Sequence, residues 1–288
     1  MTDTALIEMR GDFEVYRLPD GMEVFFRPSD HSYWSEIQQK AGRTTGVQSA
    51  RMAGVSTVVS PLDWNPDSLM RWGSRMDHAG IATLAAEGLS LEEPDDMRAA
   101  LSWLTTGERI GEALDISKLG WKDVRDDAAR RGTNVHLHAL HALAAGESVP
   151  AYAEMTDEER GYAQGITGWW LGAQPDVIAT EYLVACPDLR VAGRPDLLCR
   201  LRDGRTALVD AKTGTFLAVK FVGQLAGYAL LGERCGYERP DVGVILQVAA
   251  DGSHNPVEIP LDDSVFLAAL TTYRTAGEVQ KTLRAARA

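Results

Sequence analysis

Residues 193–212 of the chain read Gly-Arg-Pro-Asp-Leu-Leu-Cys-Arg-Leu-Arg-Asp-Gly-Arg-Thr-Ala-Leu-Val-Asp-Ala-Lys. Apolar runs on either side of Asp203-Gly204 are typical of two strands joined by a tight turn, so this stretch predicts an antiparallel hairpin. If the strands pair, the carboxylates of Asp196 and Asp210 converge on one point. Lys212 then lies on the same face as Asp210, because strand side chains alternate. The hairpin therefore predicts a site with two carboxylates and one ammonium group.

Such a site suits phosphodiester hydrolysis. Carboxylate oxygens are good ligands for Mg²⁺ or Mn²⁺, and the bound ion polarises a phosphoryl oxygen and lowers the pKa of its water. The ammonium group of Lys212 would position the attacking water or balance developing negative charge. An Asp-x-Lys sequence at a strand end is also common by chance, and its side chains are then only solvated. Whether Asp210 and Lys212 form a functional site or are only solvated therefore depends on the motifs found around them.

The elements predicted around the hairpin describe an α/β chain. Alternation over residues 13–16 and 23–26, with a Pro-Asp-Gly turn between them, predicts an amino-terminal β-hairpin. Helical spacing of apolar residues then predicts a helical accessory region over 67–120. The further predicted elements are helices over 121–146 and 156–172, the second opened by a capping box, strands over 177–186, 190–201 and 206–211, a helix over 216–235, a strand over 242–249 and a helix over 262–288. We expect an accessory region over 1–120 and a separate core over 121–288.

Composition limits the classes of protein that the chain can belong to. Its 288 residues, 45% of them hydrophobic, suffice for one substantial core or a core with a smaller accessory domain. No apolar run has the length of a membrane span and residues 1–10 do not resemble a signal peptide, so we expect a cytoplasmic protein without a membrane partner. Cys186, Cys199 and Cys235 form no CxxC pair, which argues against a zinc ribbon and favours buried reduced thiols.

The net charge of −12 is unfavourable for a nucleic-acid partner, because phosphate binding depends on Lys and Arg. Residues 121–235, however, contain 13 Lys and Arg against 15 Asp and Glu. Three of those acids, Glu181, Asp196 and Asp210, are candidate site carboxylates that a divalent ion would offset. The surplus acidity therefore lies mostly outside the predicted site.

Four features occur in an order that resembles the RecB-like branch of the PD-(D/E)xK nuclease superfamily, which includes phage exonucleases and CRISPR-associated adaptation exonucleases. They are Gly132-Thr133-Asn134-Val135-His136, Gly193-Arg194-Pro195-Asp196, Asp210-Ala211-Lys212-Thr213-Gly214, and Gln224 with Tyr228. Together they cover roughly residues 121 to 250. The resemblance implies a restriction-endonuclease-like core, in which helices flank a mixed central sheet, and a deoxyribonuclease that depends on Mg²⁺ or Mn²⁺.

The resemblance also implies a role for each matching residue. The implied metal ligands are His136, Asp196, Asp210 and the backbone carbonyl of Ala211, with Lys212 as the catalytic lysine. Glu181 stands where the family often has an upstream acid, which orients a ligand or serves a second ion. Residues that contact DNA or brace the site are Gln224, Tyr228, Arg194 and Thr213.

Each role has a simpler alternative. His136 is alternatively a core histidine, Glu181 a solvent-facing residue, and Gln224 with Tyr228 only a packing pair. His138 and His141 also suggest zinc. On an α-helix, residues two apart point about 200° from each other, so His136 and His138 cannot share an ion. His138 and His141 are able to share one, but a third ligand is not evident.

The chain also differs from many RecB-like exonucleases in its cysteines. Many RecB-like exonucleases hold an iron–sulfur cluster through four cysteines, and this chain has three, none placed that way, so we expect no cluster. A phosphate-binding Gly-x-x-x-x-Gly-Lys-[Ser/Thr] motif is absent from the sequence, so ATP is not implied.

The leading hypothesis is a phage-type DNA exonuclease of recombination, replication or repair, acting on linear ends and partnered by a single-strand annealing or other recombination protein in the host cytoplasm. A structure-specific endonuclease on the same core is the second hypothesis. A non-catalytic DNA-binding protein that retains the fold is the third.

Overall fold

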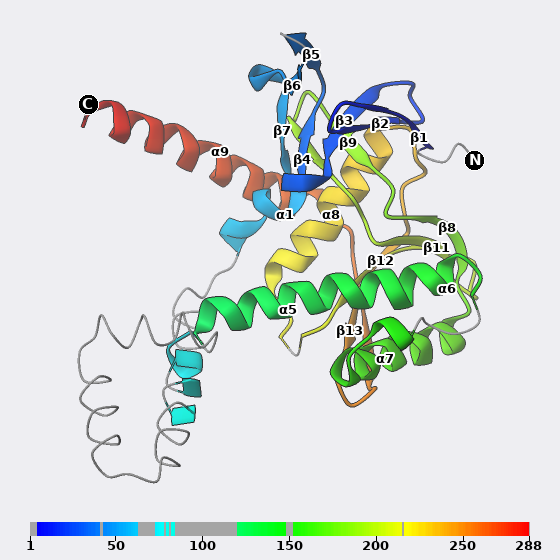
Figure 1. Cartoon of the computed structure of the whole chain (residues 1–288). Helices are drawn as coiled ribbons and strands as arrows, with labels where there is room; N and C mark the ends of the chain where they lie inside the picture. The colour runs from blue at the N-terminus through cyan, green and yellow to red at the C-terminus, as the bar shows by residue number, and fades with distance from the viewer. Residues whose placement is uncertain are drawn as a thin grey trace, which may run out of the picture. The chain divides into compact units, whose positions relative to one another are not determined.

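A computed structural model describes residues 5–40, 43–62, 73–77, 79–80, 82–83, 120–147, 152–214 and 216–287. The chain has a mixed α/β fold, as expected (Figure 1). Most of the helical region expected over 67–120 lies outside the described residues. Within the described residues, no helix is both long and apolar enough to cross a membrane.

The chain divides into two compact units. One unit contains residues 1–64 together with 135–288, and the other contains residues 65–134. This grouping differs from the division at residue 120 that the sequence suggests. The reason is a non-local pairing, because strands from residues 51–54 and 191–193 lie side by side in one sheet.

A seven-stranded sheet joins the amino-terminal residues to the later part of the chain. The predicted hairpin over residues 13–26 is confirmed as its β2–β3 pair, with Val15 opposite Phe25. In spatial order the strands are β1 (Ala5–Arg10), β2 (Phe13–Arg17), β3 (Glu23–Arg27), β4 (Ser32–Trp34), β7 (Arg51–Gly54), β10 (Val191–Gly193) and β9 (Val184–Cys186). A separate pair consists of β5 (Ile37–Lys40) and β6 (Arg43–Gly46).

A five-stranded sheet carries the predicted site. Its spatial order is β14 (His254–Ile259), β13 (Val242–Val248), β12 (Thr206–Lys212), β11 (Leu197–Arg200) and β8 (Asp176–Thr180). The predicted hairpin around Asp203-Gly204 is confirmed, since β11 and β12 pair antiparallel and Gly204 has φ +89°. β12 and β13 are parallel and are covered on two faces, so nearly all of their residues are buried and most of them are apolar. The polar exceptions are Thr206, Asp210 and Lys212 in β12 and Gln247 in β13. β14 was not predicted. Pro256, which has no N–H, is compatible with its edge position.

The strands predicted over 177–186 and 190–201 are each wrong in one respect, because neither is continuous. The first is interrupted after Thr180, where Glu181 has φ +44°, and the second is interrupted at Arg194-Pro195-Asp196. Proline lacks an N–H and cannot extend a sheet ladder in both directions. Each predicted strand is therefore two short strands, one in the five-stranded sheet and one in the seven-stranded sheet.

Two hydrophobic clusters cover opposite faces of the five-stranded sheet. Leu198, Leu208 and Ile245 pack with helix α8 (Val219–Arg234), which lies between the two sheets (Figure 1). On the other face, Val209 and Leu246 pack with helix α7 (Asp157–Ala173). The predicted capping box of α7 is present at Thr156 and Glu159. Further helices are α1 (Val55–Val58), α5 (Trp121–Val135), α6 (Ala142–Ala144) and α9 (Asp263–Ala285), and there are 3₁₀ turns at η1 (Pro28–Asp30), η2 (Gln48–Ala50), η3 (Ser60–Leu62) and η5 (Tyr152–Glu154).

The helix predicted over 121–146 contains one irregular turn. Residues His136–His141 form a π-helix, η4, between α5 and α6. In a π-helix each N–H bonds to the carbonyl five residues earlier, and such turns occur frequently at functional sites. The π-turn is important below because it changes which histidines share a face.

Close packing of α7 against the β13–β14 turn requires a glycine. A Cβ added at Gly161 would lie 1.8 Å from the backbone oxygen of Ala250, whereas one added at Gly172 of the same helix would meet nothing within 4 Å. We expect Gly161→Ala to destabilise the protein by about 2 kcal/mol or more, because backbone cannot move aside as a side chain does. Gly172→Ala should be neutral or stabilising by up to about 1 kcal/mol. Urea unfolding of both variants checks this, and equal midpoints would refute the packing.

Candidate active site

Three carboxylates occupy one row across neighbouring strands. Leu197 of β11 is paired with Thr180 of β8 and with Val209 of β12. One position further along, the Glu181 N–H donates to the backbone oxygen of Asp196 at 3.1 Å. The register of the hairpin likewise sets Asp196 beside Asp210. The predicted convergence of the two aspartates therefore has a direct basis in strand pairing, and Glu181 extends the row.

This row lies where the chain leaves the five-stranded sheet. Glu181 follows β8, and Asp196 precedes β11 directly after Pro195. Glu181 adopts a left-handed backbone with φ +44°, which is uncommon for a residue with a side chain. Such outliers cluster at functional sites, where the surrounding structure holds them in place. The carboxylates of Glu181 and Asp196 therefore lie where the two predicted strands are interrupted.

Asp210 is the most buried member of the row, with 1% of its side chain exposed. Its Oδ2 lies 2.5 Å from Nζ of Lys212, which is two residues along β12 on the same face. Apart from this ion pair, neither carboxylate oxygen has a hydrogen-bond partner among the described residues. Burial of an ionised carboxylate without hydrogen-bond donors costs folding free energy, unless a cation binds its oxygens.

Electrostatics at Asp210 are consistent with that cost. Burial raises its pKa from 3.8 to about 6, and the negative charge of Asp196 adds to the rise, although Lys212 acts in the opposite direction. Burial on its own would lower the pKa of Lys212, but the attraction of Asp210 and Asp196 outweighs it and the pKa is raised. Lys212 is therefore charged at neutral pH and held against the carboxylates.

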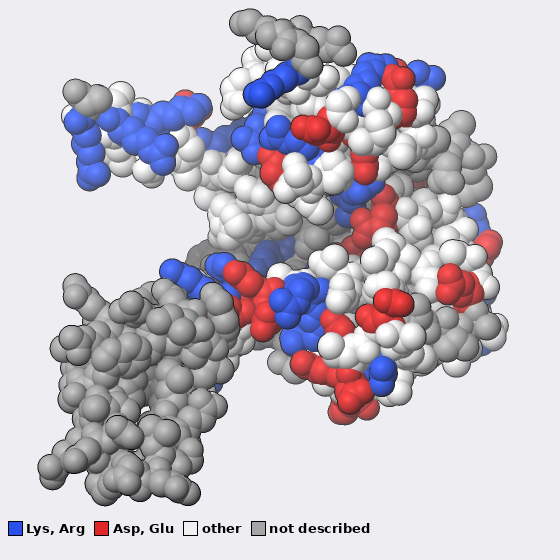
Figure 2. All heavy atoms as spheres, viewed as in Figure 1, with Lys and Arg blue, Asp and Glu red and all other residues white. Residues whose placement is uncertain are grey.

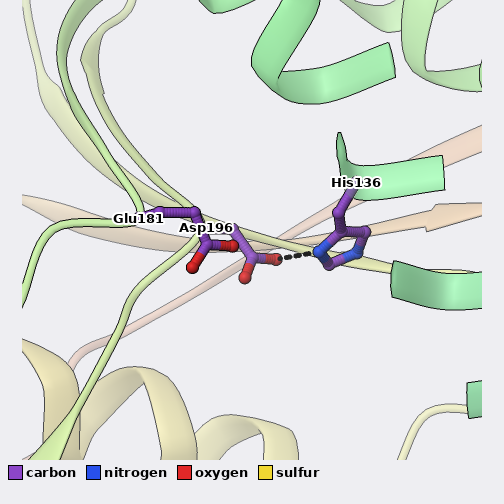
Figure 3. Close-up of side chains that lie close together, drawn as sticks. All are labelled: His136, Glu181 and Asp196. Carbon is purple, nitrogen blue, oxygen red and sulfur yellow. Dashed lines mark ion pairs between the residues drawn. The ribbon is translucent and has the colours of Figure 1, made fainter. Parts of the chain in front are cut away.

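His136 completes the group on the opposite side of Asp196. Its Nε2 lies 3.0 Å from the backbone oxygen of Ala211, and its Nδ1 lies 3.5 Å from Oδ2 of Asp196. The Ala211 N–H donates to the same Oδ2 at 2.9 Å. Figure 3 shows the Asp196 carboxylate between the Glu181 carboxylate and the His136 ring. Ligand atoms of His136, Glu181 and Asp196 lie within 4.8 Å of one another, a spacing that one metal ion can bridge.

His141 also faces the carboxylate row, which the sequence interpretation missed. Its Nε2 lies 3.3 Å from Oε1 of Glu181. On an α-helix, His136 and His141 would point about 140° apart, so helical spacing gave no reason to group them. The sequence signal that would have found the pair is a five-residue spacing, which matches the i→i+5 hydrogen bond of a π-helix.

Gln224 and Tyr228 lie on α8 beside the site. Nε2 of Gln224 donates to the Tyr228 hydroxyl at 3.1 Å. The Tyr228 ring is buried against Gly193, where an added Cβ would approach the ring to 2.5 Å. Burial, followed by the charge of Asp210, raises the pKa of Tyr228 well above its usual value. This geometry fits the bracing role expected for Tyr228, and it explains the glycine in the Gly193-Arg194-Pro195-Asp196 motif.

Arg194 is directed to the seven-stranded sheet. Its guanidinium lies over the rings of Tyr16 and Phe26, at 5.0 Å and 4.7 Å, and it donates to the Tyr16 hydroxyl. Glu14 lies 3.8 Å from it. Arg194 therefore links the site to the amino-terminal strands. Thr213 is half-buried and directly follows β12.

The three cysteines are buried and reduced. Cys235 donates to the backbone oxygens of Ala185 and Leu231. Burial raises the pKa of the Cys199 and Cys235 thiols to about 12, so both are uncharged at neutral pH. Thiolate is the form that ligates metal, and these two thiols therefore behave as small core residues.

No family model matches the sequence, and no curated protein matches it. One similar solved structure, described as "Crystal structure of SSO0001", is 20% identical, with a TM-score of 0.24. The match covers 30% of this chain and 41% of that chain. The similarity is therefore confined to part of each chain.

Proposed function

We propose that this protein is a divalent-metal-dependent deoxyribonuclease with a PD-(D/E)xK core. The observation that carries the proposal is the Asp210 carboxylate. It is buried, has Lys212 against one oxygen, and has no hydrogen-bond partner among the described residues. A cation held between Asp210 and the neighbouring Asp196 would satisfy these oxygens, which is the requirement of a metal-dependent phosphodiesterase site.

The arrangement of the five-stranded sheet supports the same proposal. Helix α8 connects the parallel strands β12 and β13, and α7 packs on the opposite face. The result is a mixed sheet flanked by helices, which the resemblance to RecB-like nucleases implies. Asp196, Asp210 and Lys212 all come from the β11–β12 hairpin at the centre of this sheet.

The residues present fit a hard divalent cation. His136, Glu181 and Asp196 have ligand atoms close enough to hold one ion, and the resemblance adds the neighbouring Asp210 and the Ala211 carbonyl to the ligand set. The ion would supply polarisation of the phosphoryl oxygen and a water of lowered pKa. The charged Lys212 ammonium, fixed against Asp210, orients that water or stabilises negative charge developing on the phosphate. Tyr228 and Gln224 keep α8 packed against the hairpin, so the carboxylates keep their spacing.

Local charge allows DNA binding despite the net charge of −12. Figure 2 shows Lys and Arg gathered along the carboxyl-terminal part of α9. Arg274, Lys281, Arg284 and Arg287 are exposed there, with Glu278 as the acidic residue among them. Exposed basic side chains of this kind bind the phosphate backbone without regard to sequence.

A nuclease fits the site better than a non-catalytic DNA-binding protein does. A binding protein has no need for an ammonium group against a buried carboxylate, and Asp210 costs folding free energy when it is ionised. Preference for an exonuclease over an endonuclease rests on the resemblance to phage exonucleases alone.

The experiment that tests the proposal is incubation of the purified protein with end-labelled linear DNA and covalently closed circular DNA, in Mn²⁺, Mg²⁺ or EDTA. We expect degradation of the linear DNA with either ion and no degradation in EDTA. Cleavage of the circular DNA would select the endonuclease. Intact DNA under all conditions, from a protein that binds it, would select the non-catalytic alternative.

His136 gives a prediction about metal preference. Mn²⁺ accepts nitrogen ligands more readily than Mg²⁺ does, so we expect the wild type to work better with Mn²⁺. His136→Ala should raise the metal concentration at half-maximal rate and narrow the preference for Mn²⁺. His138→Ala is the control. His138 belongs to the same π-turn, but a side chain two residues further along a helix is expected to project to the other side. If cleavage were lost in His138→Ala and retained in His136→Ala, the assignment of the ligand would be wrong.

A further inference from the structure

We infer that a groove between α9 and the seven-stranded sheet binds the phosphate backbone of DNA at a distance from the candidate active site. The groove has a volume of about 960 Å³, and its walls include β7, the turn before β10 and the part of α9 from Leu270 to Lys281 (Figure 1). All of its lining residues belong to the unit of residues 1–64 and 135–288. The inference rests on the proposed function for its ligand, DNA, and adds a binding surface that the resemblance does not supply.

The walls of the groove are joined at the turn before β10. Arg190 ends this turn with a left-handed φ of +49°, and its N–H donates to the backbone oxygen of Pro187 at 2.9 Å. The Arg190 guanidinium donates to the backbone oxygen of Arg51 in the parallel neighbour β7 at 3.3 Å. From α9, Arg274 donates to the backbone oxygen of Leu189 in the same turn at 2.6 Å. Arginines from three separate segments therefore line one groove.

The groove is basic although the chain as a whole is acidic. Its charged lining residues are the basic Arg51, Arg190, Arg274 and Lys281 and the acidic Asp30 and Glu278. Asp30 is paired with Arg27, which lies outside the lining, and Glu278 is paired with Lys281. The three arginines form no ion pair within the part of the chain that the structure describes. They contact backbone oxygens or the Trp34 ring instead, so their charge is available to an anion.

Arginines without carboxylate partners are suited to phosphate. A guanidinium group has five N–H donors, and the single hydrogen bonds of Arg190 and Arg274 to backbone oxygens leave donors for a ligand. Gln48 and Thr57 also line the groove and offer neutral donors of the kind that contact phosphate oxygens in protein–DNA complexes. Such contacts hold the DNA backbone without reading its sequence.

The groove lies within reach of a DNA strand bound at the carboxylates. Arg190 and Asp196 are six residues apart in the chain, which span at most about 20 Å even when fully extended. Phosphates follow one another at about 3.4 Å along one strand of B-DNA, so about six nucleotides cover this distance. A single DNA molecule is therefore long enough to occupy both places, which favours DNA over an acidic peptide as the ligand.

The test is the affinity for a fluorescently labelled linear duplex, measured by anisotropy in EDTA over a range of salt concentrations. We expect a variant that combines Arg190→Gln with Arg274→Gln to bind about tenfold more weakly or worse, with a salt slope lower by about 2, or about 1 for each lost phosphate contact. Arg51→Gln should lower the slope by about 1. It provides a second test, because the Arg51 side chain makes no hydrogen bond within the described part of the chain.

The matched control combines Arg200→Gln with Arg202→Gln. These arginines are also exposed and also donate to neutral oxygens, of Gly204 and Gln174, but they lie outside the groove. The control changes the net charge by the same amount and should bind DNA as the wild type does. Circular dichroism of each variant establishes that it is folded.

The possible results separate this inference from the proposed function. Equal weakening in the groove variant and the control would show that only total charge matters, and it would overturn the groove. Wild-type affinity in folded Arg51→Gln and in the folded double variant of the groove would also overturn it. Wild-type protein that binds DNA through the groove but leaves it intact in Mn²⁺ would overturn the proposed function alone. Wild-type protein that does not bind DNA would overturn both.

Discussion

Asp210→Asn is expected to abolish metal-dependent DNA cleavage and at the same time to stabilise the metal-free protein. A neutral amide is a poor replacement for a hard anionic ligand, so the variant should lose the ion at Asp210 and with it the activity. Asp196→Asn should have the same effect on cleavage. Initial rates on end-labelled DNA, together with Mn²⁺ titration, measure both losses. Undiminished Mn²⁺ affinity in both variants would exclude these residues as ligands.

The stability change follows from the pKa of Asp210. Its pKa is 3.8 when exposed and about 6 in the folded protein, so folding favours the neutral carboxyl group. Ionised Asp210 therefore lowers the free energy of unfolding at pH above 6, and this cost disappears as the pH falls below 3.8. A shift of this size corresponds to at most about 3 kcal/mol. Because asparagine resembles the neutral form at every pH, the variant should be the more stable protein at pH 8.

Urea unfolding in EDTA at several pH values measures this difference. The advantage of Asp210→Asn should be largest at pH 8 and should shrink as the pH falls through 6. A variant that is less stable than the wild type at pH 8 would show that the ion pair with Lys212 outweighs the burial of the carboxylate. Residues that serve function often destabilise the fold that carries them, and the proposed role of Asp210 fits this trade-off.

Lys212→Ala is expected to reduce cleavage by a factor on the order of one hundred or more while leaving Mn²⁺ binding largely unchanged. The variant removes the ammonium group that lies 2.5 Å from Asp210, but it removes no ligand of the ion. Rate measurements at saturating Mn²⁺ isolate this effect on the chemical step.

Lys220→Ala is a matched control for Lys212→Ala. Both lysines lie near the Phe221 ring, at 5.0 Å for Lys212 and 5.6 Å for Lys220, but the ion pair with Asp210 is made by Lys212. Loss of Lys220 should therefore cost far less activity. Cleavage at the wild-type rate by folded Lys212→Ala would remove this lysine from the mechanism.

The parts of the site that the sequence predicted depend on local signals. Asp203-Gly204 specifies a tight turn, and the turn sets the register that brings Asp196 beside Asp210. Both signals lie within twenty residues of one another, so a single hairpin contains the information.

The parts that the sequence did not predict depend on non-local pairing or on irregular backbone. Parallel pairing of β7 with β10 joins residues more than one hundred positions apart, and a local pattern does not encode it. The left-handed Glu181 and the π-turn at His136–His141 are departures from regular geometry, which periodicity arguments assume. These departures occur at the candidate site itself, where local rules are expected to fail.

The most direct test of the central claim is anomalous diffraction from crystals of the protein soaked in Mn²⁺. The account predicts a manganese peak in contact with the carboxylates of Asp196 and Asp210, the backbone oxygen of Ala211 and the ring of His136. Peaks only at other places on the chain, or no peak at saturating Mn²⁺, would contradict it.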